Sequence, residues 1–173
     1  MQGLKFRKTD IVLILDDSLR SLSVPESVHV ALRSEIKDKD VWLDHERIVK
    51  ALIDLERNAI EAMPQGGILT VFGEESADGE RIMITIRDTG TGIPQEHLDE
   101  LLTPFFSTKP VGEGTGLGLP SAYSTVKAHR GEMRIESNAD PERGPTGTTV
   151  RIALPRRLIQ PPSSQRSIIL DHD

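Results

Sequence analysis

Two glycine clusters constrain this chain more than any other feature, and both lie within residues 88–119. The first reads DTGTGIP over residues 88–94, and the second reads GEGTGLGL over residues 112–119. Dense glycines allow left-handed dihedrals and close ligand approach, and a glycine run that opens a helix presents free N–H groups to an anion. The clusters therefore predict a cradle for a phosphate and a base with a movable cover. The alternative is a pair of surface turns.

The clusters do not match the better-known nucleotide fingerprints. No GxxxxGK[ST] motif occurs, and the GxGxG spacing of Gly114, Gly116 and Gly118 differs from GxGxxG. P-loop and Rossmann interpretations therefore lose support.

Composition narrows the class of protein. The 173 residues, 36% hydrophobic and 28% charged, fit one domain with tails. Aromatic residues make up 3% and the net charge is −6, so we expect no nucleic-acid surface. The absence of cysteine excludes disulfides and thiolate chemistry and suits a cytoplasmic protein. No apolar run approaches the ~18 residues of a membrane span, so we expect no membrane contact in this segment, although a parent protein could carry an anchor elsewhere.

The first part of the chain is expected to alternate short elements. Residues 1–8 are interpreted as a linker remnant, residues 9–155 as the domain and residues 156–173 as a linker or tail. The apolar run 11–15 is too short for periodicity to decide, and a strand followed by a helix through Leu22 is favoured. Residues 28–33 alternate like a half-buried strand, and residues 41–43 predict a brief further strand.

A long helix follows, with Asp44 as its predicted N-cap and an end near Met63. Apolar residues recur at helical spacing along one face of it. A second stripe of the same spacing carries Asp54, Asn58 and Glu61. A polar stripe alone is equally consistent with a solvated flank, so its meaning depends on what faces it.

Residues 68–74 and 81–87 predict a β-hairpin whose second strand delivers Asp88. A buried carboxylate there needs donors, and the amino group of a nucleobase is one such donor. The alternative is that Asp88 only caps the following turn.

Beyond Asp88 we expect a short helix after Pro94 and a lid over residues 103–116, in which Lys109 is placed to meet a phosphate. A helix over residues 117–129 then directs its first amides at the cradle and ends at Gly131. Residues 133–137 and 148–154 predict a last hairpin.

With these residues laid out, the chain resembles the catalytic ATP-binding domain of bacterial sensor histidine kinases, which share a superfamily with gyrase-type, MutL-type and chaperone ATPases (the GHKL group). Five motifs occur in the family's order: LERNAIEAMPQGG, DTGTGIP, TPFFSTK, GTGLGL and GTTVRIALP. The resemblance implies an α/β fold of the Bergerat type, a two-layer sandwich in which a mixed sheet backs three helices beneath a flexible ATP lid.

The resemblance also implies a site for ATP and Mg²⁺. Asn58 would coordinate Mg²⁺ and Asp88 would bind the adenine amino group. Thr149, or its neighbour Thr148, would lie near adenine. Other residues that the resemblance places around ATP are Gly90, Gly92, Ile93, Lys109, Gly114, Thr115, Gly116, Leu117, Gly118 and Leu119.

The chain departs from the family pattern at three places. Glu61 and Ala62 replace a lysine-tyrosine pair that many of these kinases carry. Asp54 replaces a second asparagine and is either a general base or an outer ligand of Mg²⁺. The phosphoacceptor histidine motif is missing.

The resemblance therefore implies a kinase module that donates the γ-phosphate of ATP to a histidine on a separate dimerisation domain, with a response regulator receiver domain downstream in a two-component phosphorelay. Alternatives are a serine kinase of the anti-sigma-factor type, a conformational ATPase, or a nucleotide-binding module without catalysis. We expect the isolated chain to be a monomer with little activity. Residues 168–173 resemble the first strand of a receiver domain, the alternative being a disordered tail.

Overall fold

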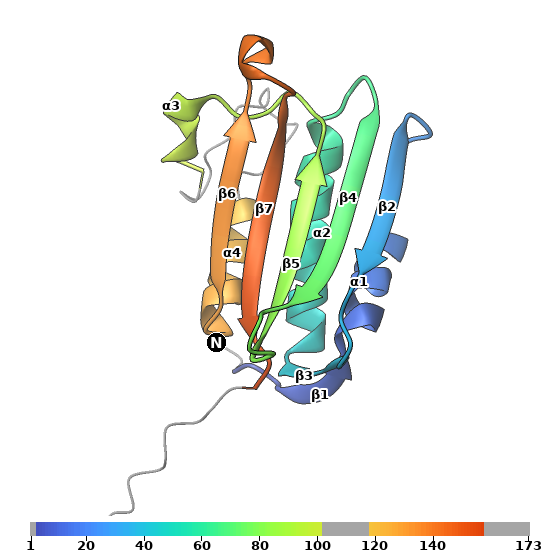
Figure 1. The fold of residues 1–173 in the computed structure, drawn as a ribbon, viewed down its shortest axis with the longest axis vertical. Helices are drawn as coiled ribbons and strands as arrows, with labels where there is room; N and C mark the ends of the chain where they lie inside the picture. Colours follow the sequence, from blue (N-terminus) through green and yellow to red (C-terminus); the bar gives the residue numbers. More distant parts are fainter. Residues whose placement is uncertain (1–2, 102–117, 158–173) are drawn as a thin grey trace, which may run out of the picture.

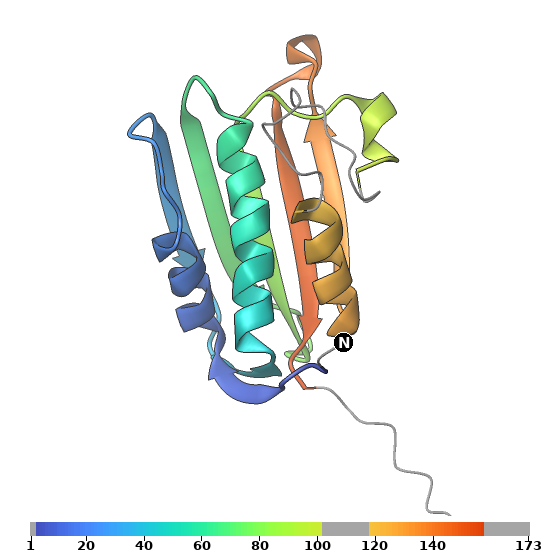
Figure 2. The same ribbon diagram turned by 180° about the vertical axis from the view of Figure 1, so that it is seen from behind.

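A computed structural model describes residues 3–101 and 118–157, which form a five-stranded sheet with helices α1, α2 and α4 on one face (Figures 1 and 2). The strand order is β2-β4-β5-β7-β6, and a separate pair joins β1 to β3. The two-layer α/β sandwich that the sequence predicted is confirmed. The elements in chain order are β1 Arg7–Asp10, α1 Ile11–Arg20, β2 Val28–Ser34, β3 Asp40–Leu43, α2 His45–Glu61, β4 Gly67–Glu75, β5 Arg81–Asp88, α3 Gln95–Leu98, α4 Gly118–Ala128, β6 Glu132–Asn138, the 3₁₀ turn Pro141–Arg143 and β7 Gly147–Pro155.

The sheet is mixed, because β2 runs parallel to β4 while the other neighbouring strands are antiparallel. The predicted hairpins are present as β4 with β5 and as β6 with β7. Residues 35–39 connect β2 to β3. The short helix predicted after Pro94 is α3.

The apolar run 11–15 forms a helix, so the strand expected there was wrong. Helix α1 begins at Ile11, where Oδ1 of Asp10 accepts hydrogen bonds from the amides of Val12, at 2.8 Å, and Leu13, at 3.3 Å. The buried residues of α1 recur every three to four positions. This period is visible in the sequence only when residues 16–20 are considered together with the apolar run. The strand here is β1, which pairs with β3 and includes two residues of the expected linker.

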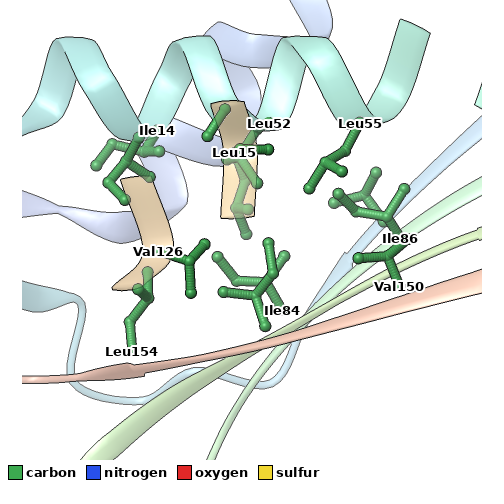
Figure 3. Packing of buried hydrophobic residues seen from close by; sticks show 14 of the residues in the cluster. Ile14, Leu15, Leu52, Leu55, Ile84, Ile86, Val126, Val150 and Leu154 are labelled. Carbon is green, nitrogen blue, oxygen red and sulfur yellow. The ribbon is translucent and has the colours of Figure 1, made fainter. Parts of the chain in front are cut away.

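Helix α2 supplies the middle of the helical layer. Asp44 caps it as predicted, with a carboxylate oxygen 3.2 Å from the amide nitrogen of Arg47. Leu52 and Leu55 point from α2 toward Ile84 and Ile86 of β5, in a core that is aliphatic throughout (Figure 3). Burying each such side chain contributes on the order of 1.5–3 kcal/mol.

The end of α4 differs from the expected glycine cap. Arg130 takes the left-handed conformation, with φ of 57°, and the amide of Gly131 donates to the carbonyl of Val126 at 2.9 Å. A Cβ at Gly131 would lie 2.5 Å from the carbonyl oxygen of Ala153. Glycine is thus required at 131 by close packing on β7, and Arg130 terminates the helix.

The folded unit continues beyond Pro155. Arg156 is buried, and its guanidinium donates to the carbonyls of Gly79 at 2.8 Å, Asp38 at 2.7 Å and Asp40 at 2.8 Å. It also contacts the carboxylate of Glu75. This residue, which the sequence assigned to the tail, therefore closes the end of the sheet where β1 and β3 lie.

Candidate nucleotide site

The site begins at Asp88, which stands at the end of β5 and is 5% exposed. Its Oδ1 accepts a hydrogen bond from the amide of Gly90 at 2.9 Å and another from the amide of Thr148 at 3.2 Å. The second bond ties β5 to the start of β7 across 60 positions of sequence. Asp88 therefore does cap the following turn, but it also holds two strands together.

The electrostatics of Asp88 are set by burial, which raises the pKa of its carboxyl, while the amides of Gly90 and Thr148 lower that pKa. Among the described residues, Oδ2 accepts no hydrogen bond. One oxygen is thus held by the backbone, and the other is open to a donor from a ligand.

The threonine beside Asp88 is Thr148, and not the Thr149 that the sequence favoured. Thr148 is buried on the helix side of β7 together with Val150, whereas Thr149 pairs with Arg87 on the opposite face. The side-chain period of two means that one position along a strand changes the face.

Ser137 was not among the predicted residues, yet it links the turn after Asp88, at Ile93, to the start of β7, at Gly147. Its hydroxyl oxygen lies 2.7 Å from that of Thr148, accepts from the amide of Ile93 at 2.7 Å and lies 3.0 Å from the carbonyl oxygen of Gly147. One feature of the sequence could have pointed to Ser137. It alternates with Met133 and Ile135 along β6, so a hydroxyl stands at a position that faces the helices.

Gly90 and Gly92 are required by contacts within the chain. A Cβ at Gly90 would lie 2.3 Å from the carbonyl oxygen of Ala62, and one at Gly92 would lie 2.0 Å from that of Asn138. Gly92 also has a φ of +72°. These glycines let the turn after Asp88 pass between the end of α2 and the end of β6.

The same turn connects Asp88 to Asn58. The amide of Thr91 donates to the carbonyl of Ala62 at 3.0 Å, and the amide of Ala62 donates to the carbonyl of Asn58 at 3.1 Å. Asn58 is therefore one helical turn from the point where the glycine-bearing segment meets α2.

The start of α4 completes the arrangement. A Cβ at Gly118 would lie 3.6 Å from Cβ of Asp54 and 4.0 Å from Nδ2 of Asn58. Asp54 and Asn58 of the polar stripe on α2 thus lie beside the first residue of α4, and Leu119 packs against the core. Asp54 also lies 3.2 Å from Nζ of Lys50 and 3.9 Å from Nη1 of Arg57. The predicted residues Lys109, Gly114, Thr115, Gly116 and Leu117 lie outside the described residues.

The possible metal ligands of this site suit Mg²⁺ better than a metal that takes all of its ligands from the protein. Within residues 3–101 and 118–157, no three His, Cys, Asp or Glu side chains come together as a metal site. Mg²⁺ is commonly held by one or two protein oxygens with phosphate oxygens and water, and the amide oxygen of Asn58 is of that kind.

Two other features of the described part of the chain lie outside the site. A surface hollow at the opposite end of β5 is lined mainly by acidic and small side chains, among them Glu74 and Asp78, which would repel phosphates. No helix in the two described ranges is both long and apolar enough to cross a bilayer.

Comparison with known proteins identifies the family and the fold. Residues 43–158 match the family described as histidine kinase-, DNA gyrase B-, and HSP90-like ATPase. Sporulation kinase C of Bacillus subtilis is 35% identical over 130 residues, which are 73% of this chain and 28% of that protein. Sensor histidine kinase ZraS of Escherichia coli is 33% identical over 155 residues, which are 88% of this chain and 31% of that protein. The chain thus spans about a third or less of these relatives.

Among solved structures, the mycobacterial sensor histidine kinase MprB superposes with a TM-score of 0.74 at 27% identity, covering 88% of this chain and 99% of that one. The catalytic domain of histidine kinase ThkA has a TM-score of 0.72 at 23% identity, which shows the shared fold. The chain therefore belongs to the histidine kinase-, DNA gyrase B- and HSP90-like ATPase family, and its fold is that of a histidine kinase catalytic domain.

Proposed function

We propose that this chain binds Mg·ATP between β5, α2 and α4 and donates the γ-phosphate to a histidine on a separate dimerisation domain. One observation carries the proposal: the turn after Asp88 connects two polar residues that could hold the two ends of ATP. Asp88 has an open carboxylate oxygen, and Asn58 faces the start of α4. The relatives named as kinases support the same reaction class.

In this proposal Asp88 recognises the adenine amino group through Oδ2, because Oδ1 is already held by two backbone amides. Thr148 lies beside it, while Gly90, Gly92 and Ile93 shape the turn around the base. The first amides of α4 point toward the phosphates, which the partial positive charge of a helix N-terminus favours.

Asn58 would hold Mg²⁺, which when bound would neutralise phosphate charge. Asp54 remains either a general base or an outer ligand of the metal, and Lys50 and Arg57 lie near its carboxylate. Lys109, Gly114, Thr115, Gly116 and Leu117 keep the places around ATP that the resemblance implies, with Lys109 meeting a phosphate. Phosphoryl transfer depends mostly on positioning and charge neutralisation, and these residues supply both.

The transfer breaks the bond between the γ-phosphorus and the β–γ bridging oxygen and forms a phosphorus–nitrogen bond on the acceptor histidine, with ADP as the leaving group. The partners would be the dimerisation domain and a response regulator. One structural neighbour, ThkA, was solved in complex with the response regulator TrrA. We place the protein on the cytoplasmic side of the cell, where ATP is available.

Calorimetric titration of ATP into the chain, with and without Mg²⁺, tests the binding part of this proposal. Labelled γ-phosphate followed onto a histidine-bearing partner tests the transfer. We expect magnesium-enhanced binding and an acid-labile label on the partner. An acid-stable phosphoserine would replace the histidine kinase assignment with that of a serine kinase, and hydrolysis by the chain alone through ATP-driven dimerisation would identify a conformational ATPase.

A further inference from the structure

The sheet face opposite α1, α2 and α4 carries a row of side chains that crosses all five strands. Arg33 pairs with Phe72, Phe72 with Thr85, Thr85 with Arg151, and Arg151 with Arg134. Residues directly opposite one another share a face of the sheet, so these five side chains form one line, which we call the basic row. Figure 1 shows the strands from this side.

The alternation of burial confirms which face the row occupies. Ile84, Ile86 and Val150 belong to the core beneath the helices, whereas Thr85 and Arg151 come between them along the same strands. Arg87 of β5 projects on the same side as Thr85, two positions further on. The basic row and Arg87 thus bring four exposed arginines onto one surface.

The positive charge of this surface is only partly neutralised. Arg151 has an ion pair with Glu136 at 2.7 Å, and the guanidinium of Arg33 lies 5.9 Å from the ring centre of Phe72. Arg87 and Arg134 have no ion pair with any described residue. Arg134 stands directly opposite Arg151, and like charges in that position destabilise a sheet.

The outward positions of the five strands carry five arginines against three glutamates, whereas the whole chain has a net charge of −6. The charged residues are Arg33, Arg81, Arg87, Arg134 and Arg151, with Glu74, Glu132 and Glu136. Four of the five strands of the sheet contain arginine, and none of the five contains lysine. Arginine and aromatic residues are enriched at protein interfaces and lysine is depleted. The guanidinium also binds carboxylates through two parallel hydrogen bonds, which a lysine cannot do.

We infer that the basic row and Arg87 form a docking surface for a carboxylate-rich face of a partner protein domain. Five strands at a spacing of about 4.8 Å give the row a length of about 19 Å, which suits one side of a standard interface. The surface lies on the other face of the sheet from Asp88 and Asn58, so a docked partner leaves the nucleotide site open. The charge contrast with the rest of the chain would orient the partner.

A deca-glutamate peptide with blocked termini is a direct probe, because it carries the carboxylates without the rest of a partner. Amide chemical shifts of the folded chain are followed during titration at low ionic strength. We expect shifts around the basic row on all five strands and around Arg87, with binding weakened by added salt. The double variant Arg87→Gln/Arg134→Gln should bind about fivefold to tenfold more weakly, as expected for two lost surface ion pairs.

The matched control is Arg20→Gln/Arg143→Gln, which removes the same charge from exposed sites in α1 and in the 3₁₀ turn. We expect this control to bind the peptide as the unchanged chain does. Equal weakening in both double variants would mean general charge attraction and would overturn the docking surface, as would a peptide that does not bind.

Thermal unfolding separates docking from a structural role. Because Arg134 faces Arg151, we expect Arg134→Gln to leave the melting temperature unchanged or to raise it. A clearly lower melting temperature would show that Arg134 serves the fold and would overturn the inference. Phosphatidylserine vesicles and duplex DNA are tested in parallel, and binding of either through these arginines without binding of the peptide would replace the protein partner with a membrane or nucleic acid.

Discussion

The hydroxyl of Ser18 on α1 donates a hydrogen bond to Oε1 of Glu56 on α2, with 2.9 Å between the oxygens, and both residues are 0% exposed. The other oxygen, Oε2, is buried without a hydrogen-bond partner among the described residues. Burial raises the pKa of Glu56 to about 8, against the smaller opposing effect of Ser18. The carboxyl is therefore mostly protonated at neutral pH.

Stability should consequently fall as pH rises. The unfolded chain loses the Glu56 proton near the ordinary pKa of 4.5, while the folded chain keeps it until about pH 8. Between these values the unfolded state binds fewer protons, so the free energy of unfolding declines with pH. Glu56→Gln should remove that decline, which a pH series of urea denaturation measures. The total effect is on the order of 3–5 kcal/mol.

Glu46→Gln on the same helix is the matched control, since Glu46 is exposed. We expect it to keep the pH slope of the unchanged chain. A Glu56→Gln variant with the same slope as the unchanged chain would mean that Glu56 is ionised in the folded protein.

Asp88→Asn should weaken ATP binding by about 1.5–3 kcal/mol, the range of one hydrogen bond to a charged group. The amide oxygen can still accept from Gly90 and Thr148, but the amide nitrogen then replaces the open acceptor with a donor. Calorimetry measures the loss, and Asp78→Asn in the β4–β5 turn is the control. Unchanged affinity in Asp88→Asn would remove adenine recognition from this residue.

Asn58→Ala should abolish the enhancement of ATP binding by Mg²⁺ while leaving binding without metal nearly unchanged. The reason is that the amide oxygen is the proposed protein ligand of the ion. Titrations with and without Mg²⁺ give this difference directly, and Glu46→Ala at the other end of α2 is the control. A variant that loses metal-free binding as well would point to a structural role for Asn58.

Gly92→Ala should destabilise the domain more than Gly79→Ala, although both glycines have a φ near +70°. At Gly79 nothing lies within 4 Å of an added Cβ, so only the left-handed conformation is penalised, by about 1–2 kcal/mol. At Gly92 the Cβ would also lie 2.0 Å from the carbonyl oxygen of Asn138. Gly92→Ala should therefore lower the free energy of unfolding by about 1–3 kcal/mol more than Gly79→Ala does, as measured by urea denaturation. Equal losses would show that the turn relaxes freely.

Local patterns predicted much of the fold. Period-two alternation and turn residues located the β4–β5 and β6–β7 hairpins, and Asp44 marked the start of α2. The ordered motifs identified the family from the sequence alone. These features depend on neighbours in sequence, so the sequence carries them directly.

Other features depend on the face of the sheet that a residue occupies or on contacts with a distant segment. Only the tertiary structure determined these features. Residues 11–15 belong to a helix that packs against α2 and buries Ile11, Ile14 and Leu15 in the core. Thr148 rather than Thr149 meets Asp88, because strand register selects one face. The basic row is assembled from five strands, and two of the four neighbouring pairs, β2 with β4 and β5 with β7, are not consecutive in the sequence.

The sequence by itself thus determined most of the elements, the family and the residues Asp88 and Asn58 as candidates. Only the tertiary structure determined that Glu56 is buried, that Ser137 links the turn after Asp88 to the start of β7, and that arginines gather on one surface. The physical reason is that periodicity and capping act within a few residues, whereas burial, register and charge clustering are set by contacts between segments far apart in the chain.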